Sequence, residues 1–114
     1  MAAEVNALSK AYDLTQWMAE RVARFPRSHH YTVGQRLVNT LLDVQEILIE
    51  AHYSREKQPL LRRVNLLLER LRVLVRLAKD LKCLAISQYE YAAREMDMTG
   101  RLVGGWLRQQ ESSR

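Results

Sequence analysis

Helix-breaking residues are scarce in this chain, and this scarcity narrows the folds that it can adopt. The 114 residues include four glycines and two prolines. They are Pro26, Gly34, Pro59, Gly100, Gly104 and Gly105. Elsewhere apolar residues recur at steps of three and four, without strict alternation and without an Asn-Gly or Asp-Gly hairpin signal. The sequence therefore predicts an all-α protein.

Two helices are predicted in the first half of the chain. The first is expected over residues 3–24, because Pro26 disfavours the helical conformation of the residue before it. The second is expected over residues 32–53, because Thr32 and Gln35 have the spacing of a capping box. The stretch between them, FPRSHHY, is interpreted as a connection between helices.

Two more helices are predicted in the second half. Pro59 suits the first turn of a helix, where no amide donor is needed, and places the third helix over residues 58–83. Ser87 and Glu90 form a second capping box, which places the fourth helix over residues 87–110. Helices of this length with short connections predict an up-down-up-down antiparallel four-helix bundle, a single domain of the whole chain.

The second and third predicted helices have broad apolar faces. In the second, the core face is expected to contain Leu37, Leu41, Val44, Leu48 and Ala51, widened by Val38, Leu42 and Ile49. In the third, the core arc is expected to contain Leu60, Val64, Leu67, Leu68, Leu71, Leu74, Val75, Ala78 and Leu81.

A second apolar line runs along the third helix, away from its core arc. Leu66, Val73 and Leu77 share this line, where an isolated bundle would leave them in water. Burying each side chain would contribute roughly 1.5 to 3 kcal/mol, and contiguous apolar patches commonly mark interfaces. The line predicts self-association, and if the oligomer is ring-like its symmetry repeats the same surfaces on every subunit. The alternative is three scattered surface aliphatics, which are ordinary.

Positive charge is concentrated in the same region. The net charge is +5, but residues 55–82 contain nine cations and three anions, so the rest of the chain is close to neutral. Arg72, Arg76 and Lys79 lie on one side of the third helix, with Arg62 near them. Because like charges on one helix face repel, an external polyanion is a natural counter-charge. Few aromatic residues accompany the stripe, so contact with a nucleic-acid backbone is expected rather than base recognition. The alternative is a solvated basic face, partly paired with Glu69 and Asp80.

No cofactor or catalytic site is expected. His29 and His30 are neighbours that would point apart on a regular element, with no further ligand at helical spacing, and a metal site is not predicted there. Ser87 has no nearby histidine, Cys83 has no evident base, and no phosphate loop is present. Cys83 is expected to be a buried thiol. The chain is therefore predicted not to be an enzyme.

The sequence also bears on location. No apolar run approaches the roughly 20 residues of a membrane span, and no basic region followed by an apolar one opens the chain. We expect a cytoplasmic protein with no membrane partner.

Several motifs, taken in order, resemble one known family. They are FPRSHHYTVGQR followed by LLDVQEILIEA, then LLERLRVLVRLAKDL, then ISQYEYAAREMDMTGRLVGGWL. The chain resembles, over about residues 8–108, the four-helix-bundle family that contains the accessory variability determinant (Avd) of diversity-generating retroelements. His30 departs from the family pattern, where a basic residue, usually arginine, is expected.

The resemblance implies a ring-like or barrel homo-oligomer, a homopentamer, whose non-catalytic subunits have a basic surface. Such a subunit associates with the retroelement reverse transcriptase and its template RNA, and supports the error-prone cDNA synthesis that diversifies a target gene. By position, the candidates for contact with RNA, DNA or the reverse transcriptase are Arg62, Arg63, Arg72, Arg76 and Lys79. Gly100, Gly104 and Gly105 are expected to permit close helix packing, and Trp106 to be a core or interface anchor.

Two other functions stay open on the sequence alone. Related bundles include proteins encoded within ribosomal-RNA intervening sequences, so the chain could be a structural or regulatory bundle that binds only protein. An enzyme of unrecognised type is the other.

Overall fold

The computed structural model describes residues 2–112, with side chains from Glu4 onward. Four long helices form the bundle: α1 (Ala2–Val22), α3 (Gln35–Tyr53), α4 (Lys57–Asp80) and α5 (Ile86–Ser112). A short helix, α2 (Arg27–His29), and a π-helical turn, η1 (His30–Gly34), precede α3. No strand occurs among the described residues, which confirms the predicted all-α class.

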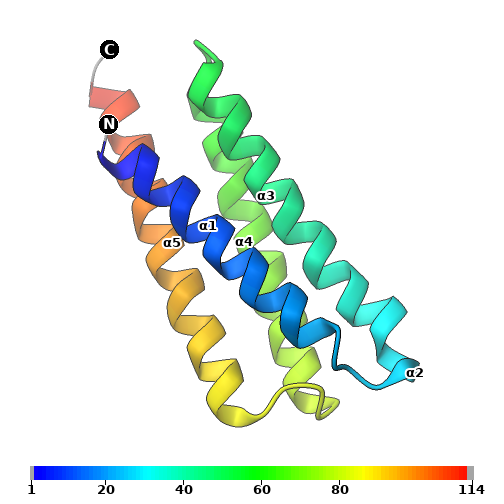
Figure 1. Cartoon of the computed structure of the whole chain (residues 1–114). Helices are drawn as coiled ribbons and strands as arrows, with labels where there is room; N and C mark the ends of the chain where they lie inside the picture. Colours follow the sequence, from blue (N-terminus) through cyan, green and yellow to red (C-terminus); the bar gives the residue numbers. More distant parts are fainter. Residues whose placement is uncertain (1, 113–114) are drawn as a thin grey trace.

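Each long helix packs on two others. α1 lies against α3 and α5, and α4 lies against the same two helices, so α1 and α4 occupy opposite corners. Successive long helices run in opposite directions, and the start of α1 and the end of α5 meet at one end of the bundle (Figure 1). The predicted up-down-up-down topology is confirmed.

The core contains most of the predicted residues and adds others. Leu14, Leu61 and Trp106 are buried although the first two were not expected there. Trp106 is thus a core anchor, as predicted. Leu81 was expected in the core and is exposed, because α4 ends at Asp80 and Leu81 is its C-cap.

Two further core expectations, Leu42 and Ile49 on α3, are wrong. They are 44% and 46% exposed. Gln45, on the same side of α3, donates from Nε2 to the carbonyl oxygen of Leu8, which identifies this side as the edge facing α1. Leu42 and Ile49 lie just outside that contact. The apolar face of α3 is therefore wider than the core it serves.

The connection before α3 is helical, which corrects the predicted capping box. The carbonyl oxygen of Pro26 accepts hydrogen bonds from the amides of His29 and His30, at 2.8 and 2.9 Å, so helical structure begins directly after the proline. Thr32 lies inside η1, and its hydroxyl donates to the carbonyl oxygen of His29 at 3.3 Å instead of capping Gln35.

The π-helical turn is fastened to the end of α1. His30 Nδ1 lies 3.0 Å from the carbonyl oxygen of Val22. Since a carbonyl oxygen only accepts, this nitrogen donates. The same oxygen, at the C-terminus of α1, also accepts a hydrogen bond from the amide of Phe25 at 3.0 Å. Gly34 is packed so closely that a Cβ would lie 2.8 Å from Val22 Cγ1. His30 and Gly34 therefore have structural roles at the same crossing.

The second predicted capping box is also displaced. α5 begins at Ile86, and the amide of Ala85 donates to Gln88 Oε1 at 2.9 Å, so Gln88 reaches back to the residue before the helix. Ser87 is already within the first turn. Ala85 and Gln88 thus make the side-chain contact of a capping box, two residues before the predicted pair, Ser87 and Glu90.

α4 ends in a Schellman motif. The amide of Cys83 donates to the carbonyl oxygen of Ala78 at 2.8 Å, and the amide of Lys82 donates to the carbonyl oxygen of Lys79 at 2.9 Å. Lys82 has a φ of 65°, the left-handed conformation in which glycine is usual.

Glycine at position 82 should therefore stabilise the protein. A left-handed residue other than glycine carries a steric penalty of roughly 1 to 2 kcal/mol, which the unfolded chain's extra freedom partly offsets. We expect Lys82→Gly to raise the free energy of unfolding by about 0.5 to 1 kcal/mol, measured by urea denaturation. Lys82→Ala is the control, because it removes the same side chain but keeps the Cβ. A Gly variant no more stable than the Ala variant would contradict this account.

Candidate nucleic-acid and subunit interfaces

The predicted apolar line on α4 is exposed. Leu66, Val73 and Leu77 are 59%, 68% and 43% exposed, so their position outside the core is confirmed. Arg63, three residues before Leu66, and Arg70, between Leu66 and Val73, fall on the same line at helical steps. We name these five residues the α4 ridge. Its role as a subunit interface stays a prediction.

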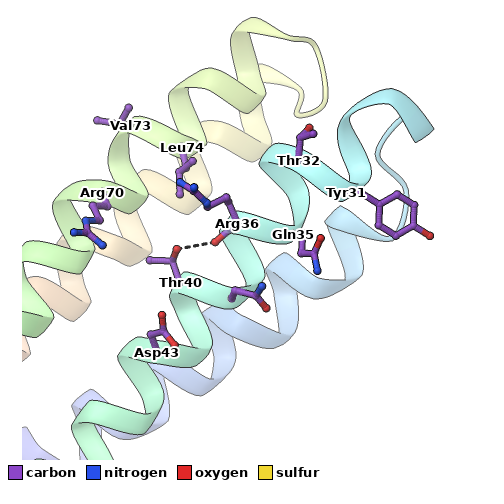
Figure 2. A pocket seen from close by; sticks show the side chains of 10 residues that line it. Tyr31, Thr32, Gln35, Arg36, Thr40, Asp43, Arg70, Val73 and Leu74 are labelled. Carbon is purple, nitrogen blue, oxygen red and sulfur yellow. Dashed lines mark hydrogen bonds between the residues drawn. The ribbon is translucent and has the colours of Figure 1, made fainter.

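Grooves flank the α4 ridge on both sides. The groove between α3 and α4 has a volume of about 810 Å³, and Arg36 points into it from α3 while Arg70 projects from α4 (Figure 2). Asp43 adds a carboxylate to the same groove. The groove between α4 and α5 measures about 600 Å³ and includes Leu66 and Arg101. The ridge is thus raised above two hollows, a shape suited to insertion into a complementary surface.

Two members of the predicted basic stripe, Arg62 and Arg72, form ion pairs with acids of α5. Arg62 Nη2 lies 3.2 Å from Glu111 Oε1. Arg72 donates a hydrogen bond to Asp97, and its Nε lies 3.2 Å from Oε1 of Glu69 on α4, an ion-pair distance. The hydrogen bond to Asp97 raises the pKa of Arg72 above its ordinary value. The premise of a missing counter-charge is therefore wrong for Arg62 and Arg72, since Glu111 and Asp97 come from a helix remote in sequence.

The rest of the stripe is more weakly held. Arg76 and Lys79 both lie near Asp80, with N to O distances of 4.0 and 3.5 Å. Such exposed pairs contribute little and remain open to exchange with another anion. Arg63 has no ion pair among residues 2–112. A binding role for these cations stays a prediction.

A further line of cations, on α5, was not anticipated. Arg94, Arg101 and Arg108 follow one another at seven-residue steps and are exposed. We name them the α5 arginine face. Within the described part of the chain they have no ion pair. Their seven-residue spacing was visible in the sequence. However, α5 also contains four acids, so its net charge gave no sign of a cationic face.

His52 and Cys83 are each partly enclosed by the bundle. His52 Nδ1 pairs with Glu4 across the end of the bundle. Cys83 is half-buried rather than fully buried, and burial raises the pKa of its thiol. In residues 2–112, no three His, Cys, Asp or Glu side chains are grouped as metal ligands would be.

No helix within the described residues has the length and apolar character needed to cross a bilayer. Four antiparallel helices, with an apolar ridge and a cationic face directed outward, define a helical-bundle protein with surfaces suited to binding.

The family described as bAvd-like matches residues 7–110. The chain belongs to this family, and the resemblance to the Avd proteins is confirmed. No curated protein matches the chain.

Proposed function

We propose that this chain is a non-catalytic accessory subunit of a diversity-generating retroelement. It binds the reverse transcriptase and nucleic acid, template RNA or cDNA, through its basic surface, and so supports mutagenic cDNA synthesis. The observation that carries this proposal is the bAvd-like match over residues 7–110. The cations without ion pairs among the described residues of α4 and α5 support it, because they leave counter-charge to be supplied from outside.

The subunit acts in this proposal as a ring-like homo-oligomer, a pentamer by family resemblance. Two surfaces on different helices support a head-to-tail contact: the α4 ridge, and an α3 face made of Leu42, Glu46, Ile49 and Glu50. Both combine exposed aliphatics with charge, positive on the ridge and negative on the α3 face. Contacts between unlike surfaces generate rings when the rotation closes.

Ring symmetry also increases the effect of modest charge. Every copy presents the same cations, so the field of the assembly exceeds that of one subunit. Arg62, Arg63, Arg72, Arg76 and Lys79 are candidates for contact with RNA or with the reverse transcriptase within this field.

The wild-type protein provides the direct test. We expect it to co-purify with the reverse transcriptase encoded beside its gene, and to bind RNA in a filter assay with an affinity that falls steeply with salt. The logarithmic slope should be about −0.7 per phosphate contact for a single strand. Capture of the polymerase without RNA binding would favour the protein-only bundle. Failure of both measurements would overturn the proposal.

A further inference from the structure

Three of the four carboxylates of α5 form ion pairs with cations on other helices. Glu95 bonds Lys10 of α1 at 2.9 Å, Asp97 bonds Arg72 of α4, and Glu111 bonds Arg62 of α4 at 3.2 Å. The hydrogen bond to Glu95 raises the pKa of Lys10, as expected of a cation held by an acid. Three acids of α5 thus form ion pairs at the contacts of α5 with α1 and α4.

The arginines of α5 are left without these acids. Arg94, Arg101 and Arg108 lie on the outward side of the helix, about 10 Å apart at 1.5 Å per residue. Glu90 is exposed at the N-terminal end of the same side, where it faces only the first of them along the helix. A helix whose sequence is nearly balanced therefore presents a cationic surface once folded.

Gly104 and Gly105 lie between the last two arginines, and no contact among residues 2–112 requires them to be glycine. A Cβ at Gly104 would meet only Arg108 Nη1, at 3.5 Å, and one at Gly105 only Arg108 Nη2, at 3.8 Å. The predicted role in close helix packing is therefore wrong for this pair. Alanine would be the better helix former at both positions. What the pair does provide is bare backbone beside the Arg108 guanidinium, where an outside molecule can approach closely.

We propose that the α5 arginine face, with Gly104 and Gly105, is the surface on which this subunit binds the phosphate backbone of single-stranded RNA. The inference rests on the proposed function and assigns it a site. A planar guanidinium matches a phosphate with two parallel hydrogen bonds. Of the aromatic rings described on α5 near these arginines, Trp106 is buried and Tyr91 packs on Trp17 with ring centroids 4.9 Å apart, so neither is offered for stacking. The contact is therefore with the backbone and tolerant of sequence.

The test compares two triple variants that lose the same charge. One replaces the face, Arg94→Gln, Arg101→Gln and Arg108→Gln. The control replaces exposed arginines at the helix connections, Arg24→Gln, Arg27→Gln and Arg55→Gln. Binding of a short mixed-sequence RNA is measured by filter retention over a salt series. For three lost phosphate contacts, we expect the RNA affinity of the face variant to fall about 100-fold near 0.1 M salt. The slope of log affinity against log salt concentration should become less steep by about 2. The control should change far less.

The outcomes separate this inference from the proposed function. If wild type binds RNA and the face variant binds equally well, or if both variants weaken equally, the α5 assignment is overturned while RNA binding stands. If the face variant loses the reverse transcriptase but not RNA, the face is a protein contact and the assignment is again overturned. If wild type binds no RNA, RNA binding itself is refuted and the assignment fails with it.

A charge-neutral variant tests the glycine pair. Gly104→Gln with Gly105→Gln places two side chains over the bare backbone without altering net charge. We expect RNA affinity to fall about fivefold, the value of one phosphate contact near 0.1 M salt, while helicity by circular dichroism is kept or increased. Unchanged affinity in this well-folded variant would remove the glycine pair from the site.

Discussion

Alanine at position 34 is expected to lower the free energy of unfolding by about 1 to 3 kcal/mol, the usual cost of forcing atoms into a packed core. The new Cβ would lie 2.8 Å from Val22 Cγ1, 3.2 Å from Phe25 Cδ2 and 3.3 Å from the carbonyl oxygen of His29. Val22 and Phe25 are buried, so neither can swing into solvent to make room. The backbone contact cannot be relieved by a rotamer change at all.

The same substitution at position 104 is the matched control. A Cβ there meets only the flexible end of Arg108, so Gly104→Ala should raise the free energy of unfolding by up to about 1 kcal/mol through helix propensity. Urea denaturation of both variants gives the comparison. Equal stability of the two variants would show that the residues around Gly34 move to accommodate a Cβ, and that the close packing there does not contribute to the free energy of unfolding.

The contrast between these glycines shows what the sequence could and could not reveal about the fold. Periodic apolar residues predicted all four long helices, because each helix needs only its own neighbours in sequence to define its face. The helical turn after Pro26 was missed. It is fixed by the bond from His30 to the carbonyl oxygen of Val22 and by the contact at Gly34, which exist only once α1 has packed.

Features of the candidate sites were likewise predictable only where they depend on neighbours in sequence. Exposure of Leu66, Val73 and Leu77 followed from their angle on one helix and was predictable. Ion pairing depended on partners far along the chain, as with Arg62 and Glu111, which are 49 positions apart. Counting charges along the sequence therefore placed the uncompensated cations on α4 alone, whereas the folded bundle also leaves the arginines of α5 without partners among the described residues.

Glutamate at two positions of the α4 ridge is expected to dissociate the proposed homo-oligomer. In Leu66→Glu with Val73→Glu, association would bury two charges among apolar side chains, which is strongly unfavourable. Light scattering should give a multiple of the 13.4 kDa chain for wild type and the chain mass for the variant. Ile86→Glu with Met98→Glu is the control, since both residues are exposed apolar side chains on α5. Unaltered mass in the ridge variant would place the interface elsewhere.

Mixing two defective subunits shows whether the ridge meets the α3 face of the next copy. Leu42→Glu with Ile49→Glu should by itself also give a monomer, because a head-to-tail ring needs both surfaces on every copy. The ridge variant keeps a sound α3 face, and the α3 variant keeps a sound ridge. Together they have one intact interface per pair and cannot extend further, so light scattering of the mixture should give a heterodimer of twice 13.4 kDa. If the ridge instead packs on another ridge, the α3 variant assembles alone and the mixture forms no heterodimer.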